Sequence, residues 1–415
     1  MRTNLRQDWT RWRERGDLVA AAAPMAPSAS PKLDFLRTFA VLLVLVSHVD
    51  KAQGVRWLEL SSLAPIGRLG VLLFFVHTSL VLMFSLERHV ALHGHRRLFS
   101  TFMLRRVFRI YPLSIAVILA IVIFGIPGVN VAAHSVEYVG TDAFGLIADL
   151  LLVQNIAISD TGANALLGPL WSLPLEIQMY LFLPGLFLLV RPIRNARVLL
   201  FLWACSVAVS VGTYLAMQMF GMTVAHVPGG RIDVPKILVY APYFLAGILA
   251  YAFWRHARQR VRFAALPGFL LVSLVLYIGV SNAPGGEHTV DIFGMVICLG
   301  VGLLLPVLIE PAHPAVCRVS ATVAKYSYGI YLVHVPCIWL GFDVFAGYPL
   351  AVQWLVFLGG TAALAATAYH VIERPFITLG ARLGTRWAED RSRRADRRPV
   401  APPAPAKPAL SSEGS

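Results

Sequence analysis

Charged residues are scarce in this chain. Asp, Glu, Lys and Arg make up 14% of its 415 residues, hydrophobic residues make up 57%, and the mean hydropathy is +0.67. A water-soluble domain carries about 25% charged residues. The composition therefore excludes an ordinary soluble domain and predicts an all-α, polytopic membrane protein.

Cysteine is also rare, and its placement excludes two kinds of site. The four cysteines form no CxxC pair, so neither a disulfide framework nor a metal site is expected. The net charge of +14 raises the question of nucleic acid, but the basic residues stand in short clusters between apolar runs. Such clusters fix membrane topology, so we expect no nucleic-acid partner.

Eleven apolar runs approach the roughly 20 residues that a membrane span needs. They are 33–50, 67–86, 107–125, 143–158, 173–190, 198–220, 234–254, 263–280, 290–309, 326–345 and 350–370. The run 143–158 is the weakest, because it is short and contains Asp149. If it does not span, every basic cluster falls on one side of the membrane. The positive-inside rule then predicts about ten transmembrane helices, plus one re-entrant or interfacial helix at 143–158 that borders a cavity.

The two ends of the chain are polar. Residues 1–31 are predicted to be a disordered, basic cytoplasmic leader, although 18–27 also resembles a weak signal peptide. Residues 378–415 are rich in charge and proline and are predicted to be a disordered cytoplasmic tail. Between them, residues 32–377 are predicted to form a transmembrane domain in contact with lipids. We expect it to lie in the inner (plasma) membrane with both termini in the cytoplasm.

The first apolar run, 33–48, contains Asp34, Arg37 and His48. Arg37 and His48 are eleven positions apart, which returns to within about 20° of the same helix face and separates them by roughly 16 Å. Ionisable groups inside a span are costly, so they are expected to face the bundle interior and to function there. The alternative is an arginine that anchors the helix at one surface and a histidine at the other.

Two further spans carry ionisable groups near their starts. Arg106 and Arg109, at i and i+3, share a helix face, and arginine suits bidentate phosphate binding. Arg105 points about 100° away and is the better candidate for an interfacial anchor. Glu176 stands just inside an apolar helix, where it is either functional or a structural ion-pair partner of an arginine.

Histidines and a C-terminal motif complete the candidates. His77 and His334 each lie within a span and suit structural hydrogen bonding as well as function. Glu373 and Arg374 are expected to terminate the last span, with Pro375 stopping the helix.

Six segments, taken together and in order, resemble the membrane acyltransferase-3 family. They are LDFLRTFAVLLVLVSH (33–48), FFVHTSL (74–80), FMLRRVFRIYP (102–112), GPLWSLPLEIQMYLFLP (168–184), YSYGIYLVHVP (326–336) and IERPF (372–376). The resemblance covers roughly 32–377 and implies a ten-helix fold. It implies transfer of an acyl group, often acetyl, from cytoplasmic acyl-CoA to hydroxyls of envelope glycans, lipid-linked sugars or small secreted products.

The family's motifs fall on particular residues of this chain. They are Arg37 and His48, then Arg106 and Arg109, then Trp171, Ser172, Leu173 and Glu176. One segment departs from the family. Its second helix usually reads FF-x-LSGF, whereas here His77 and Thr78 replace Leu-Ser and Leu80 replaces the last Phe. The role of that serine is therefore not carried over, and Ser79 is a weak substitute.

The resemblance implies a division of roles. Transfer from a thioester to a hydroxyl needs a base and stabilisation of an oxyanion. We expect His48 to be the base, with Glu176 as a second catalytic residue. Arg37, Arg106 and Arg109 are expected to bind the acyl-CoA donor, which we expect to be acetyl-CoA. No metal is expected. The acceptor, a carbohydrate, lipid-linked or small-molecule hydroxyl, is not readable from the sequence. A covalent acyl-histidine, a transporter or flippase of a lipid-linked sugar, and a non-catalytic subunit remain alternatives.

Overall fold

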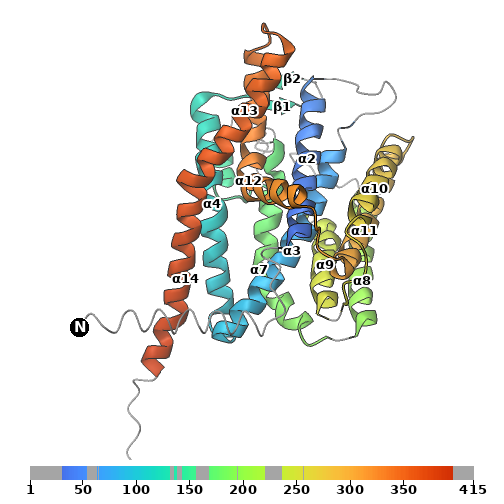
Figure 1. Cartoon of the computed structure of the whole chain (residues 1–415), viewed down its shortest axis with the longest axis vertical. Helices are drawn as coiled ribbons and strands as arrows, with labels where there is room; N and C mark the ends of the chain where they lie inside the picture. Colours follow the sequence, from blue (N-terminus) through green and yellow to red (C-terminus); the bar gives the residue numbers. More distant parts are fainter. Residues whose placement is uncertain are drawn as a thin grey trace, which may run out of the picture.

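The computed structural model describes residues 30–53, 63, 65–130, 135–137, 143–155, 168–193, 195–219, 236–255 and 257–395. Within these residues the fold is a bundle of long helices (Figure 1). The first five are α2 (Pro31–Gln53), α3 (Ile66–His93), α4 (Leu98–Phe124), α7 (Ser172–Val190) and α8 (Ala196–Met219). The next five are α9 (Lys236–Trp254), α10 (Ala265–Ser281), α11 (Gly286–Leu304), α12 (Pro314–Trp339) and α13 (Leu350–Ala368).

Short elements connect or extend these helices. They are β1 (Gly128–Asn130), β2 (Ser135–Glu137), α5 (Ala143–Leu150), η2 (Gly168–Trp171), η3 (Leu305–Val307), the π-helical η4 (Leu340–Val344) and η5 (Tyr369–Glu373), and α14 (Arg374–Ala395). The two strands form a three-residue antiparallel ribbon. Apart from this ribbon and an isolated bridge between Val261 and Leu308, the described structure is helical, as predicted.

The surface of the bundle suits lipid. Seven helical segments of the described residues are long and apolar enough to cross a membrane. Large apolar side chains point outward from several of them, including Val209 on α8, Leu271 on α10 and Leu355 on α13. So much exposed apolar surface is unfavourable in water and expected in a bilayer. The prediction of an all-α, polytopic membrane protein is therefore confirmed.

Contacts bring the basic clusters to one end of the bundle, which we call the basic end. Arg191, after α7, pairs with Glu87 of α3 at 3.5 Å, and Arg255, after α9, donates to the Arg191 carbonyl at 3.0 Å. Arg97, before α4, donates to the carbonyl of Trp387 in α14 at 2.9 Å. These three loops are far apart in sequence but lie at the same end of the bundle. The basic loops predicted to be on one side of the membrane are therefore on one side of the structure.

The start of α2 is fixed at the same end. The ammonium of Lys32, fully buried, donates to the Leu308 carbonyl at 2.6 Å and lies 3.5 Å from Glu310. It also lies 4.3 Å from the ring centroid of Trp254, the last residue of α9. A buried charge needs such partners. The position of α2, which carries Arg37 and His48, is thereby set by residues of the α9–α12 region.

The described part of the predicted re-entrant segment does not cross the bundle. Its helix α5 has 8 residues, which is about 12 Å long and far too short to span. Tyr111, midway along α4, donates to the Leu151 carbonyl at 2.9 Å, and Gln178 of α7 donates to Asn155 at 3.0 Å. The segment therefore enters beside α4 and α7 and turns there, and its backbone is satisfied by protein.

One predicted helix end is wrong, and one helix is longer than its apolar run. The apolar run of the third span starts at 107, whereas α4 begins at Leu98, so Arg105, Arg106 and Arg109 lie on one helix, as their spacing predicts. The last span was expected to stop at Pro375, but η5 leads directly into α14. Pro375 is the second residue of α14, a position in the first turn where proline is tolerated because its missing N–H is not needed.

The helix α14 also moves the boundary of the predicted tail. It runs to Ala395, so residues 378–395 are helical, while 1–29 and 396–415, which hold most of the predicted leader and tail, lie outside the described residues. Gly380 allows the close contact with α4, since a Cβ there would collide with Phe108. Figure 1 shows α14 running alongside α4. Packing against a neighbouring helix thus stabilises a sequence whose composition predicts disorder.

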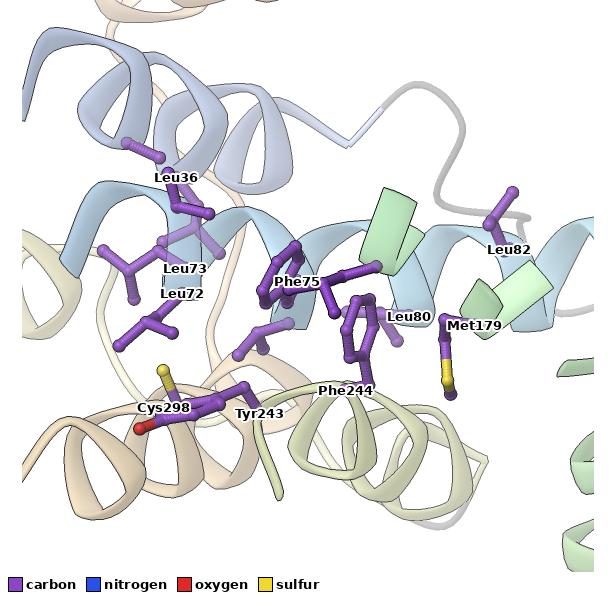
Figure 2. Packing of buried hydrophobic residues seen from close by; sticks show 14 of the residues in the cluster. Leu36, Leu72, Leu73, Phe75, Leu80, Leu82, Met179, Tyr243, Phe244 and Cys298 are labelled. Atoms are coloured by element: carbon purple, nitrogen blue, oxygen red, sulfur yellow. The ribbon is translucent and has the colours of Figure 1, made fainter. Parts of the chain in front are cut away.

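The core lies around α3. Figure 2 shows its apolar side chains between α2 and α9, including Phe75 and Phe244, whose rings stack at 4.2 Å with an interplanar angle of 22°. Gly247 permits the crossing of α9 over α3, because a side chain there would overlap Ser79 and the Val76 carbonyl. Tight packing on both sides holds α3 as a rigid wall for the site described next.

Candidate active site

A polar cavity lies inside the bundle, between α2, α3, α4, α7 and α12. It contains about 580 Å³ of empty space, part of it open to the outside. Its lining residues are Arg37, Val71, Phe74, Phe75, Thr78, Arg109, Ile110, Ser172, Leu173, Glu176, Tyr180, Ser327, Tyr328 and Tyr331. Three of the five predicted site residues, Arg37, Arg109 and Glu176, therefore meet in one place although they come from three different helices.

Glu176 has a tyrosine as its partner. The hydroxyl of Tyr180, one turn further along α7, donates to the Glu176 carboxylate. Among the described residues Glu176 forms no ion pair within 4.0 Å, although Arg37 and Arg109 lie within electrostatic range. The structural ion pair considered from the sequence is thus not formed at contact distance, and the arginines retain donors for another anion.

A second carboxylate enters the site from the last helix. Glu373, buried in η5, pairs with Arg109 at 3.7 Å. A π-helical turn rotates the side chains that follow it and is common at functional sites. The sequence predicts only that Glu373 ends a span. One feature of the sequence could have indicated a site role for Glu373: it is a carboxylate in an apolar run, and such a group needs a partner.

The three arginines of α4 have different surroundings. Arg109 lines the cavity, and Arg106 lies within electrostatic range of Glu176 and Tyr180. Arg105 faces away, toward Thr385 of α14 at 3.4 Å. The Nε atoms of Arg37, Arg105 and Arg106 are buried and have no hydrogen-bond partner within the described structure. Of these three arginines only Arg37 lines the cavity, where a guanidinium with a free donor is suited to an anion.

His48 lies outside the cavity lining, against a second histidine. Its ring packs edge-to-face on His334 of α12, with centroids 4.9 Å apart. Tyr331, which lines the cavity, packs on the other side of His334 at 6.0 Å. Ring contacts therefore link Tyr331, at the cavity, to His334 and His48.

Backbone carbonyls fix the tautomers of both histidines. Nδ1 of His48 lies 2.9 Å from the Val44 carbonyl, and Nδ1 of His334 lies 2.8 Å from the Tyr331 carbonyl. A carbonyl only accepts hydrogen bonds, so Nδ1 carries the proton and Nε2 of the neutral ring keeps its lone pair. Nε2 of His334 is buried with no partner among the described residues. Both rings thus present a basic nitrogen.

The departure in the second helix is clear in the structure. Thr78, at the position of the family's serine, lines the cavity. Ser79 instead donates to the Phe75 carbonyl of its own helix at 2.8 Å and abuts Gly247 of α9. The cavity thus keeps a hydroxyl, supplied by Thr78, and Ser79 is not a substitute. His77 is buried within electrostatic range of Arg37 and Arg109.

Several tyrosine contacts were not predicted from the sequence. Tyr331 shares a hydrogen bond of 2.8 Å with Ser172. Tyr328 bonds to Ser114 at 2.7 Å and to the Ile110 carbonyl at 2.8 Å. A tyrosine in a span is equally typical of an interfacial anchor, so only the structure separates these cavity residues from Tyr326, which is half-buried and outside the cavity lining.

Comparison with known proteins identifies the family. Residues 30–370 match the acyltransferase domain family, acyltransferase 3. The chain belongs to this family. It is a membrane acyltransferase, and the family assignment made from its six motifs is confirmed.

Three curated relatives cover most of the chain. Acyltransferase MdmB of Streptomyces mycarofaciens is 26% identical over 82% of this chain and 88% of its own. Nodulation protein 10 of Rhizobium leguminosarum bv. viciae is 26% identical over 83% of this chain and 93% of its own. The putative peptidoglycan O-acetyltransferase YrhL of Bacillus subtilis is 25% identical over 85% of this chain and 55% of its own. No solved structure matches.

Proposed function

We propose that the chain is an O-acyltransferase of the inner membrane that moves an acyl group, in the first instance acetyl, from cytoplasmic acyl-CoA to a hydroxyl. The observation that carries the proposal is the cavity in which Arg37, Arg109 and Glu176 meet. The acyltransferase family of the chain supports the reaction type, and its relative YrhL is named as an O-acetyltransferase.

The arginines are proposed to bind the donor. CoA carries phosphates, and guanidinium groups bind phosphate oxygens through paired N–H donors. Arg106 and Arg109 share a face of α4, whose start lies at the basic end with Arg97. If the basic end is cytoplasmic, as the positive-inside rule states, the nucleotide approaches from that side and the thioester extends into the bundle.

His48 is proposed to be the general base. Its Nε2 takes the proton of the acceptor hydroxyl while the hydroxyl oxygen attacks the thioester carbonyl carbon. The new C–O bond forms, the C–S bond breaks, and the proton passes to the departing CoA sulfur. The acyl end of the donor must pass Tyr331 to reach His48, and the pantetheine arm suits the roughly 16 Å from Arg37 to His48.

Glu176 is proposed as the second catalytic residue. Its carboxylate, held by the Tyr180 hydroxyl, balances part of the charge of Arg37 and Arg109. With Glu373 it makes two carboxylates against three arginines, Arg106 included, so a net positive charge remains for the phosphates of the donor.

The sidedness has its own test. A reporter fused after 258, at the basic end, is expected to read cytoplasmic, and one fused after 285, at the other end of α10, extracytoplasmic. The opposite pair of readings would place the donor cavity on the wrong side for cytoplasmic acyl-CoA.

The enzymatic proposal is tested by acetyl-CoA consumption in purified protein. Release of free CoA that depends on a hydroxyl acceptor, and the same mass gain on the acceptor, are the expected results. Transport of a lipid-linked sugar across vesicles without CoA release would favour the transporter, and inactivity in both assays would favour a non-catalytic subunit.

A further inference from the structure

One buried histidine has no part in the mechanism proposed above. His334, on α12, has no exposed surface. Its Nδ1 lies 2.8 Å from the Tyr331 carbonyl and 3.2 Å from the Ile330 carbonyl, so Nδ1 carries the proton and Nε2 carries a lone pair. That Nε2 is buried and has no hydrogen-bond partner in the described structure. A buried acceptor without a partner is costly, so its presence in a native fold requires an explanation.

The neighbours of His334 suggest what that explanation is. Its ring packs edge-to-face on the ring of His48, with centroids 4.9 Å apart and an interplanar angle of 78°. Its ring centroid also lies 6.0 Å from that of Tyr331, which lines the cavity. His334 therefore contacts both the proposed base and a residue of the cavity lining.

The proposed base needs a hydrogen-bond acceptor once it is protonated. When His48 takes a proton on Nε2, its ring becomes a cation with two N–H donors. The Nδ1 donor is satisfied by the Val44 carbonyl at 2.9 Å, but the new Nε2–H has no acceptor of its own. Among the described residues no carboxylate lies within 4.0 Å of His48. Asp50, the next carboxylate along α2, accepts from the Leu63 N–H at 3.1 Å.

The charge on His48 has no other evident source of stabilisation. Within the described structure, the titratable groups in electrostatic range of His48 are Lys51, one turn further along α2, and His334 of α12. Lys51 is a cation and opposes a second positive charge nearby. His334 is thus the neighbour in ring contact that can offer a lone pair to the protonated base.

We infer that His334 is a positioning residue, whose Nε2 accepts a hydrogen bond from the protonated Nε2 of His48. The acceptor hydroxyl gives its proton to His48 Nε2 while the new C–O bond forms and the C–S bond breaks. The His48 imidazolium holds that proton against His334 until it passes to the departing sulfur, so His334 itself gains and loses none. A hydrogen bond to a charged group is roughly twice as strong as a neutral one. This inference rests on the proposed O-acyltransferase function with His48 as its base.

Two substitutions at one position separate this role from packing. His334→Gln keeps an acceptor, the side-chain carbonyl oxygen, near the place of Nε2, whereas His334→Phe keeps a ring against His48 but has no lone pair. Both lose the Nδ1 bond to the Tyr331 carbonyl, so the acceptor is what differs between them. His334→Phe is expected to lower kcat about thirtyfold, the usual contribution of one hydrogen bond to a charged group. His334→Gln is expected to stay within about fivefold of the wild type.

The assay uses the full chain in inverted membrane vesicles of the source cells, which hold the native acceptor, with radiolabelled acetyl-CoA as the probe. Label in the extracted acceptor gives kcat and KM. The Kd for acetyl-CoA and the Tm, measured on purified protein, are expected to stay at their wild-type values in both variants.

The pH profile of kcat/KM is a second readout, because it reports the protonation of the base in the free enzyme. Without the lone pair of His334, His48 holds a proton less tightly and stays neutral to lower pH. The acid limb of the His334→Phe profile is therefore expected about one pH unit below that of the wild type. A residue that only packs would leave the limb in place.

His89 offers a matched control. It is a buried histidine of α3, its Nε2 lies 3.1 Å from the Arg96 carbonyl, and it is outside the cavity lining. His89→Gln and His89→Phe are expected to transfer at equal rates and to keep the acid limb of the wild type. Should His334→Phe lose the wild-type Tm, His334→Leu, which also lacks a lone pair, takes its place in the comparison.

Each failure has its own signature. If His334→Gln is as inactive as His334→Phe, then His334 takes the proton itself and the positioning role is wrong. If both variants transfer at the wild-type rate, His334 only packs, while acyl transfer by the chain stands. A wild-type chain that labels no acceptor would instead contradict the acyltransferase proposal, and the role of His334 would fall with it.

Discussion

The arginine cavity and the histidine pair are close neighbours with opposite character. The cavity gathers cations from α2 and α4 with carboxylates from α7 and η5. The pair of His48 and His334 brings two imidazole rings together, each hydrogen-bonded to a backbone carbonyl through Nδ1. Tyr331 lies between the two regions. One region is suited to holding charge and the other to moving a proton.

The different character of the two regions explains why α2 carries both Arg37 and His48, far apart along its length. A guanidinium next to a histidine base would disfavour protonation of that base. Separation along α2 lets Arg37 act on the phosphates of the donor while His48 keeps its basic nitrogen. Five substitutions test the division, and the largest expected effect comes from the histidine.

His48→Gln is expected to lower acyl transfer by a factor on the order of 10² to 10⁴, since glutamine forms hydrogen bonds but does not take the proton. The measurement is transfer to the native acceptor by protein in detergent. His313→Gln, an exposed histidine just before α12, is the control. Wild-type turnover in His48→Gln would move attention to His334 and His77.

Glu373→Gln is expected to destabilise the fold by about 2 kcal/mol, because it removes the buried partner of Arg109. The pair is long, at 3.7 Å, and Arg109 is 30% exposed, so the effect should be below that of a fully buried pair. Thermal unfolding in detergent measures it, with Thr378→Val one turn further along α14 as the control. An unchanged Tm would show that the pair contributes nothing to holding α14 on α4.

Arg106→Lys and Arg109→Lys are each expected to raise the Kd for acetyl-CoA about tenfold, since lysine keeps the charge but loses the paired donors. Arg105→Lys is the matched control, because Arg105 faces Thr385 of α14. Titration calorimetry measures the three values. Equal affinities in all three variants would remove the phosphate-binding role of the cavity.

Tyr331→Phe is expected to have the smallest effect, a reduction of transfer by about fivefold. It removes the hydrogen bond to Ser172 at 2.8 Å, and one hydrogen bond contributes about 1 kcal/mol. Steady-state transfer rates measure it, with Tyr326→Phe, whose hydroxyl is exposed, as the control. A loss as large as that of His48→Gln would give the Tyr331 hydroxyl a direct part in the chemistry.

The sequence predicted the groups of the cavity better than their partners. Long apolar runs and basic clusters sufficed for the span pattern, and helical spacing put Arg106 and Arg109 together and Arg105 apart. Long-range partners were beyond its reach: Glu373 with Arg109, Ser172 with Tyr331, and His334 with His48. These depend on how helices pack, and local periodicity carries no information on that.

The helix ends show the same limit. Pro375 is a reliable stop within a regular helix, but the π-helical turn at η5 places it in the first turn of α14. The charged residues after it are typical of a tail, whereas the structure is helical to Ala395, and its contacts with α4 and the residue before it run from Gly380 to Trp387. In both places tertiary packing outweighed a local signal.

The central claim is that donor binding and proton transfer occupy separate regions, and one measurement tests it most directly. Acetyl-CoA is titrated calorimetrically into His48→Gln, the variant expected to lack turnover. The division predicts a Kd within about twofold of the wild type, because the phosphates are held by Arg106 and Arg109. A loss of acetyl-CoA binding in His48→Gln, in protein that keeps the wild-type Tm, would contradict it.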